Sequence, residues 1–283
     1  MPSATLLGQS VVSGLLAGGL YGLLALGLSL SWGLLRLVNI AHFALALLGA
    51  YLTYQLGQVL HMAPWVAAAV VVPTFFALGV ALHVVFTRFR VTELTSLLVT
   101  FGFAVILESL IQWFWTADYR RYETPWASAS IRVGPLFVPT LELLACLTAA
   151  TLAVATWAWL RFTYVGKALR AAAEDPAMAG AFGVNHRAHA FVLSGISAAY
   201  AGVAGAFIAL ISTLAPAQIW AWLGTVFAVV IIGGLGNPVG ALLAGFLIGV
   251  SESVTMAVAA PAWAPLVSFS ILIGLLVLRP ERV

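Results

Sequence analysis

Charge is the scarcest feature of this chain. Asp, Glu, Lys and Arg together make up 7% of its 283 residues, whereas soluble globular domains carry about 25%. Apolar residues account for 63%, and they run in stretches of about 18 to 25 residues, the length that spans a bilayer as a helix. The alternation of apolar and polar residues that marks a membrane barrel is missing. We therefore expect an all-α, polytopic transmembrane helical bundle, because helices satisfy their own backbone hydrogen bonds in lipid.

Several chemical signatures are missing as well. The one cysteine, Cys146, lies in an apolar run, so a single chain can build neither a disulfide nor a cysteine-based metal site. The only Gly-Lys pair is Gly166-Lys167, and Ala168 follows it, so no ATP-binding P-loop is present. HExxH and GxSxG motifs are lacking too. We expect no catalytic site, no metal and no cofactor in this chain, and we read the formal charge of +3 as setting membrane orientation, not nucleic-acid binding.

The apolar runs predict a single transmembrane domain over residues 1–283. Residues 222–258 are too long for one ordinary span and are interrupted by GGLGNPVG. We predict two shorter helical pieces there, meeting at Gly236-Asn237-Pro238, and eight or nine membrane segments in all. The remaining spans are expected near residues 6–33, 38–60, 64–86, 95–116, 139–160, 188–212 and 263–278.

The basic residues predict an orientation. If residues 161–187 lie on the cytoplasmic side, alternation of the spans places nine of the twelve basic residues inside, the amino terminus outside and the carboxy terminus inside. The outer loop, residues 117–139, then either contacts an extracytoplasmic partner or folds as a hairpin over the bundle. The basic residues expected inside are Arg36, Arg88, Arg90, Arg161, Lys167, Arg170, Arg187, Arg279 and Arg282.

Small residues recur every four positions in three of the predicted spans. In lipid such stripes let two helices approach closely. We expect them to pack within the chain, with a dimer seam as the alternative. The stripes are Gly14, Gly18 and Gly22; Ser194, Ala198, Gly202 and Ala206; and Ala241, Gly245 and Gly249.

Residues 161–189 form the longest break between apolar runs, and their composition is that of a folded segment. Asp175 can cap a helix, Pro176 suits a first helical position, and Gly183 suits a left-handed carboxy-terminal cap. We predict two short helices with a bend at Asp175-Pro176. The alternative is a solvated connector, but the fixed bend and an alanine surface favour a docking element. Its alanines are Ala168, Ala171, Ala172, Ala173, Ala177 and Ala179.

Ionisable and interrupting residues within the spans mark a candidate path through the membrane. A charge at the centre of a membrane helix costs about 2.5 to 3.5 kcal/mol, so Glu108 and Glu252 are either hydrogen-bonded inside the bundle or used in transport, while Glu142 reaches the interface. RLVNIAH and GGLGNPVG interrupt spans in the two halves, and paired interruptions often border a transport pathway. Interfacial anchoring and a tight turn are the simpler alternatives. The candidate path residues are Asn39, His42, Gly233, Gly234, Gly236, Asn237 and Glu252.

Three stretches together resemble the permease subunits of branched-chain amino acid ABC importers, the LivH type. They are VNIAHFALALLGAYLTY, GKALRAAAEDPAMAGAFGV and IIGGLGNPVGALLAGFLIGVSES, in an order and spacing that fit over nearly the whole chain. The family usually continues Ala-His with a glycine and a small or acidic residue, whereas Phe43 and Ala44 follow His42 here. The shape of the path beside His42, and with it the substrate, can therefore differ.

The resemblance implies a multi-pass subunit of the bacterial inner membrane that is not itself an enzyme. It implies an identical or homologous second permease, ATP-binding subunits that use ATP, and a periplasmic substrate-binding protein. A permease of the same superfamily for urea, short amides or a sugar is the first alternative, and an ion-coupled carrier using Glu108 or Glu252 is the second. The second stretch corresponds to the cytoplasmic coupling loop, residues 161–187, with contact residues Gly166, Arg170, Ala173, Glu174, Asp175, Pro176 and Gly183.

Overall fold

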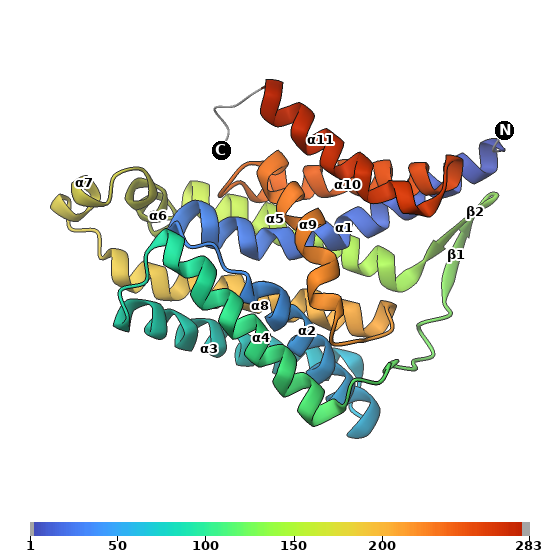
Figure 1. Ribbon diagram of the computed structural model, residues 1–283, viewed down its shortest axis with the longest axis horizontal. Coiled ribbons are helices and arrows are strands. Elements are labelled where there is room, and N and C mark those ends of the chain that lie inside the picture. Colours follow the sequence, from blue (N-terminus) through green and yellow to red (C-terminus); the bar gives the residue numbers. More distant parts are fainter. Residues whose placement is uncertain (1–2, 279–283) are drawn as a thin grey trace.

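The computed structural model describes residues 3–278, apart from the side chain of His186. It is an elongated bundle whose long helices run mostly along one axis (Figure 1), so the predicted all-α class is confirmed. The helices are α1 (Ala4–Leu35), α2 (Ala41–Tyr54), α3 (Pro64–Arg88), α4 (Glu93–Trp115), α5 (Thr140–Phe162), α6 (Tyr164–Glu174), α7 (Pro176–Ala181), α8 (His186–Ile211), α9 (Gln218–Gly233), α10 (Pro238–Val258) and α11 (Ala264–Leu278).

Within the described part of the chain, seven helices are long and apolar enough to cross a membrane. Two more are shorter: α9 has 16 residues and α2 has 14. Two predicted starts differ: α2 begins only at Ala41 and passes into a π-helical turn at Gln55–Val59, and α9 begins earlier than predicted, at Gln218. The total of eight or nine segments stays a prediction. Arg279 and Arg282 lie outside the described residues.

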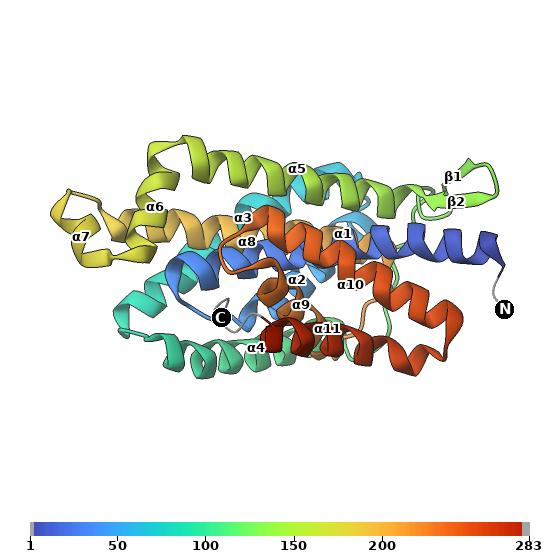
Figure 2. The ribbon, with the colours of Figure 1, turned by 90° about the horizontal axis from the view of Figure 1, so that it is seen from above.

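Glycines bring α1 and α10 into direct contact at the centre of the bundle. A Cβ added to Gly14 would lie 2.6 Å from the Cα of Val250, and one added to Gly249 would collide with the backbone at Gly14. Gly18 and Gly245 meet in the same way. The predicted close packing of these stripes is thus confirmed within a single chain, and the two helices lie side by side in both views (Figures 1 and 2).

The second half of the core lies where α8 packs on α2 and α3. Gly202 and Gly205 of α8 leave room for Phe75 of α3 and for the backbone of α2 at Ala46. Phe75 of α3 fills the space between these helices and is fully buried, and it lies against both Gly49 of α2 and Gly202 of α8. The stripe on α8 therefore also serves packing inside the chain.

One end of the bundle carries a β-hairpin and the amino terminus, and the other carries α6 and α7 (Figure 1). Strands β1 (Ser130–Val133) and β2 (Leu136–Pro139) pair antiparallel. Gln9 of α1 fixes the hairpin twice: its Nε2 donates to the Phe137 carbonyl at 2.8 Å, and its Oε1 accepts from the Phe137 N–H at 2.9 Å. Of the two expectations for this loop, the hairpin is present.

Candidate functional site

The interruption between α9 and α10 has the backbone of a true helix break. Helix α9 ends at Gly233, and Gly234 and Gly236 then take φ values of +88° and +71°, a region that L side chains rarely occupy. Asn237 begins α10 as its amino-terminal cap, with Oδ1 accepting from the Gly240 N–H at 3.0 Å. The predicted break at Gly236-Asn237-Pro238 is confirmed, and GGLGN supplies the residues that it requires.

Helix α1 holds this break in place. The Gly236 N–H lies 3.1 Å from both the carbonyl oxygen and Oγ of Ser29, and Ser29 Oγ lies 3.4 Å from the Gly234 carbonyl oxygen. A Cβ added to Gly33 would collide with the backbone of Gly236. Ser29 is therefore a residue of the site that sequence reasoning missed, since nothing in the α1 sequence marks which serine faces the break.

The other interruption, between α1 and α2, lies at the same end of α1. Arg36 ends α1 in a left-handed conformation with φ +54°. The unwound backbone that follows is satisfied by α4, because the hydroxyls of Ser96 and Thr100 accept from the N–H groups of Val38 and Ile40 at 3.1 and 3.0 Å. Non-helical backbone is tolerated at membrane depth only where protein or water satisfies it. The structure thus brings the two sequence interruptions together around the end of α1.

The polar residues of the first interruption point into the bundle. His42 is fully buried, with Nε2 3.0 Å from the Leu24 carbonyl oxygen and its ring against Gly27. Asn39 is buried too, and its Oδ1 has no hydrogen-bond partner among the described residues. Neither residue is the interfacial anchor of the simpler alternative. Their part in a transport path stays a prediction.

The acidic residues divide into separate environments. Glu252 is buried and accepts hydrogen bonds from Tyr21 at 3.0 Å and Ser268 at 2.6 Å. It lies about 21 Å along α10 from the break, so the structure separates it from the other candidate path residues. Glu108 is half-buried on α4 and accepts from the Trp220 Nε1–H of α9 at 3.0 Å. Glu142 lies in the first turn of α5.

The predicted pair of short helices is present at the opposite side of the bundle from the hairpin. Asp175 separates α6 from α7 and caps α7: its Oδ1 accepts from the N–H groups of Ala177 and Met178, both at 3.0 Å. Gly183 follows α7 with φ +81°. Arg36 ties this segment to α1 by donating to the Ala173 carbonyl at 2.9 Å. The segment is therefore a fixed element that protrudes from the bundle (Figure 2).

The exposed surface of this segment differs from the predicted alanine surface. Ala168, Ala172 and Ala179 are buried, because α6 and α7 fold their alanine sides onto the bundle, and Gly166 packs directly on the backbone of α5. The prediction is therefore wrong for these three alanines, whereas Ala171 and Ala177 are exposed. Two large apolar side chains missed by the sequence reasoning are exposed instead, Met178 and Phe182. The predicted contact residues Arg170, Glu174, Asp175, Pro176 and Gly183 are exposed, whereas Gly166 is buried and Ala173 half-buried.

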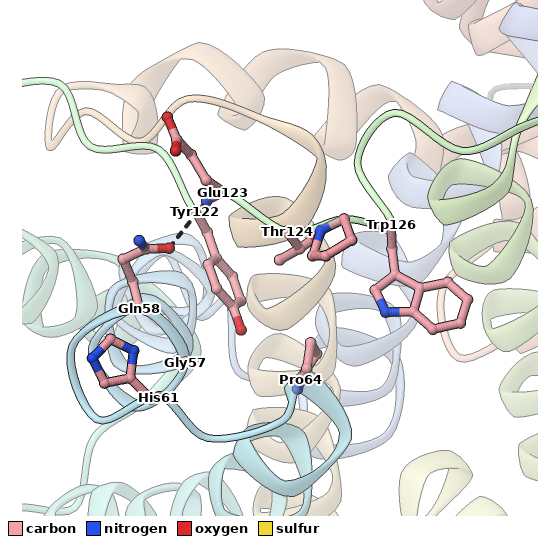
Figure 3. A pocket seen from close by; sticks show the side chains of 9 residues that line it. Gly57, Gln58, His61, Pro64, Tyr122, Glu123, Thr124 and Trp126 are labelled. Atoms are coloured by element: carbon pink, nitrogen blue, oxygen red, sulfur yellow. Dashed lines mark hydrogen bonds between the residues drawn. The ribbon is translucent and has the colours of Figure 1, made fainter.

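A pocket of about 250 Å³ opens at the hairpin end, between the turn after α2 and the loop that follows α4. The Tyr122 phenol points to Gly57, which has no side chain to block it, and Trp126 lies across the opening (Figure 3). Gln58 Oε1 accepts from the Glu123 N–H at 3.2 Å, and burial raises the pKa of the Tyr122 phenol. Sequence reasoning singled out the loop but not its partners on the turn.

The helix count, the broken α9–α10 pair and the unwound entry to α2 define a multi-pass membrane protein with the discontinuous helices of a transport bundle. The family described as branched-chain amino acid transport system, permease component, matches residues 10–276. The chain therefore belongs to that family.

Similarity to individual relatives extends over most of their length. The high-affinity branched-chain amino acid transport system permease protein LivH of Salmonella typhimurium is 25% identical over 97% of this chain and 94% of the relative. The corresponding protein BraD of Pseudomonas aeruginosa is 24% identical over the same shares. A probable LivH of Methanocaldococcus jannaschii is 28% identical over 82% of this chain and 75% of the relative. No solved structure matches the chain.

Proposed function

We propose that this chain is the permease subunit of an ABC importer that moves branched-chain or related amino acids across a bacterial inner membrane. Membership of the permease family and the printed names of the relatives support the substrate class. The observation that carries the proposal is the rigid two-helix segment α6–α7 on a chain whose sequence holds no P-loop. A chain without an ATP site can be driven by ATP hydrolysis only through contact with a subunit that binds ATP.

The ATP-binding subunits would contact the α6–α7 segment on the cytoplasmic side. Met178 on α7 and Phe182 directly after it offer apolar anchors, and Arg170 and Glu174 are exposed on α6. Interfaces gain most from a few buried large side chains with a polar rim. ATP is used by these partner subunits, and this chain contributes no cofactor site of its own.

The outer end of the bundle is assigned to the periplasmic substrate-binding protein. That end carries the hairpin and, beside the turn after α2, the pocket lined by Tyr122 and Trp126 (Figure 3). A second permease, identical or homologous, completes the path. Closure of the ATPase pair would move α6 and α7 and rock α5 and α8, which flank them in the chain, so that the path opens between the two permeases.

The test is to purify the tagged chain gently from its native membrane and to identify the associated proteins by mass spectrometry. The proposal expects one or two P-loop ATPases, with or without a second permease. Uptake in proteoliposomes should then require ATP inside the vesicle and binding protein outside. A single chain that transports alone in liposomes under an ion gradient would overturn the proposal and favour the carrier alternative.

A further inference from the structure

Three arginines gather in a cleft between the inner ends of α3 and α8. Two adjoining cavities, of about 220 and 440 Å³, share Thr87 and Arg187 as lining residues. Arg90 lines the first cavity and Arg88 the second. We call Arg88, Arg90 and Arg187 the basic cleft. It lies apart from the α9–α10 break and from the pocket at Tyr122. Arg187 ends the predicted coupling loop, residues 161–187, but it is not one of the predicted contact residues of that loop.

The charges of the basic cleft are uncompensated. All three arginines are exposed, and no acidic side chain among the described residues forms an ion pair with any of them. Three like charges around one cleft repel one another, and a multivalent anion removes that repulsion. Guanidinium groups also match phosphate oxygens in geometry, because each can donate two parallel hydrogen bonds.

The depth of the cleft favours a phosphate that belongs to lipid. Helices α3 and α8 have 25 and 26 residues, so each is about 38 Å long and exceeds the hydrocarbon core of about 30 Å. Arg88 ends α3 and Arg187 lies in the first turn of α8, which places both at headgroup level. Helix α7 extends farther out along the same axis (Figure 1). A soluble partner bound to α7 therefore lies farther from the bundle than the basic cleft does.

The walls of the cleft suit the rest of a phospholipid. Val84 and Phe191 line the second cavity beside the arginines, and Val84 is half exposed on the outer surface of α3. An acyl chain leaving the phosphate would pass over these apolar groups. The orientation expected from the positive-inside tendency places the cleft in the cytoplasmic leaflet, where basic pockets between membrane helices attract anionic headgroups.

We propose that the basic cleft is a binding site for the phosphate of an anionic phospholipid of the cytoplasmic leaflet. The site joins α3 to the first turn of α8, the helix that directly follows the coupling segment. A lipid bound there fixes the position of that turn. This inference does not depend on the transported substrate.

The experiment uses the full chain in detergent and follows its thermal unfolding as phosphatidylglycerol or phosphatidylcholine is added. The wild type should show a preference for phosphatidylglycerol that weakens as salt is raised. Each arginine near an anionic surface contributes about 1 kcal/mol, so Arg90→Gln and Arg187→Gln should each lower the apparent affinity for phosphatidylglycerol about fivefold. Arg132→Gln removes one charge from the outer hairpin and is the matched control, with no loss expected.

Three results would overturn the proposal. The first is a lack of specificity: both lipids raise the unfolding temperature equally, or Arg132→Gln lowers the affinity for phosphatidylglycerol as much as the cleft variants do. The second is stabilisation by inorganic phosphate that phosphatidylglycerol cannot displace, which would identify a free-anion site. The third is unchanged lipid preference in Arg187→Gln with loss of the copurifying ATPases, which would assign the cleft to a protein partner. Because these arginines are exposed and unpaired, the single variants should fold, and their unfolding temperature without lipid verifies it.

Discussion

Removing the cap of α7 tests whether the α6–α7 segment transmits force as a folded element. Asp175 Oδ1 accepts hydrogen bonds from two backbone N–H groups at 3.0 Å. Replacing a capping Asp by Ala costs about 0.5 to 2 kcal/mol. Helix α7 has only six residues, too few to persist without such support. Asp175→Ala should therefore raise the unfolded share of α7 about fivefold for each 1 kcal/mol lost.

Asp175→Asn is the matched control, because Asn caps helices nearly as well as Asp while lacking the charge. We expect ATP-driven uptake to fall several-fold in Asp175→Ala and to stay close to wild type in Asp175→Asn, with the same amount of protein inserted. ATP hydrolysis in Asp175→Ala should continue without matching uptake. Hydrogen exchange at the Ala177 and Met178 amides should quicken in the Ala variant only.

Two outcomes would refute the reasoning. Normal uptake in Asp175→Ala, with faster exchange confirmed, would show that coupling does not need a folded α7. Equal loss in both variants would show that the charge of Asp175 matters, through a contact with a partner, and not its cap.

Three further variants test the packing and the helix break. Gly245→Ala should lower the unfolding temperature, because the added methyl group meets the backbone of α1 and overpacking costs about 1 to 3 kcal/mol. Gly102→Ala is the control, because nothing lies within 4 Å of the added methyl group, and it should leave the unfolding temperature unchanged. Asn237→Ala should cost about 1 kcal/mol through the lost cap of α10, and an unchanged unfolding temperature would contradict that role. Glu252→Leu should destabilise by about 1 to 3 kcal/mol, since the half-buried Tyr21 hydroxyl and the buried Ser268 hydroxyl lose their acceptor. Glu252→Gln keeps one oxygen and should transport normally; loss of transport in a stable Gln variant would instead favour a proton-coupled carrier.

The parts of the fold that were predictable follow from local rules. Apolar runs, the Asp-Pro bend and the glycines beside Asn237 each act over a few residues. Most helix limits, the α6–α7 pair and the break between α9 and α10 were therefore expected. The glycine stripes predicted close approach because a missing Cβ has the same effect whichever helix is the neighbour. These features needed no knowledge of the distant parts of the chain.

The features that were missed depend on which face of a helix turns inward. Ala172 and Ala171 are neighbours of identical type, yet the first is buried and the second exposed, because α6 folds back on the bundle. Ser29 holds the break only because α1 lies beside it, and Ser96 satisfies Val38 across 58 positions of sequence. The start of α2 was predicted too early because Val38 and Ile40 continue the apolar run, although the backbone there is held by Ser96 and Thr100 of α4 and is not helical.

Helix α1 is attached at both of its ends: Gln9 holds the hairpin, and Arg36 holds the α6–α7 segment. Its 32 residues make a hydrogen-bonded rod of about 48 Å, which resists stretching far more than the loops around it. A displacement of the α6–α7 segment would therefore reach the hairpin through α1 as a rigid body, if these hydrogen bonds hold during transport. Coupling free energy is reciprocal, so if ATPase docking on α7 alters the hairpin, occupancy of the hairpin by a binding protein must alter the affinity for the ATPase by the same factor. Docking of a binding protein would then change the affinity for the ATPase before any ATP is hydrolysed.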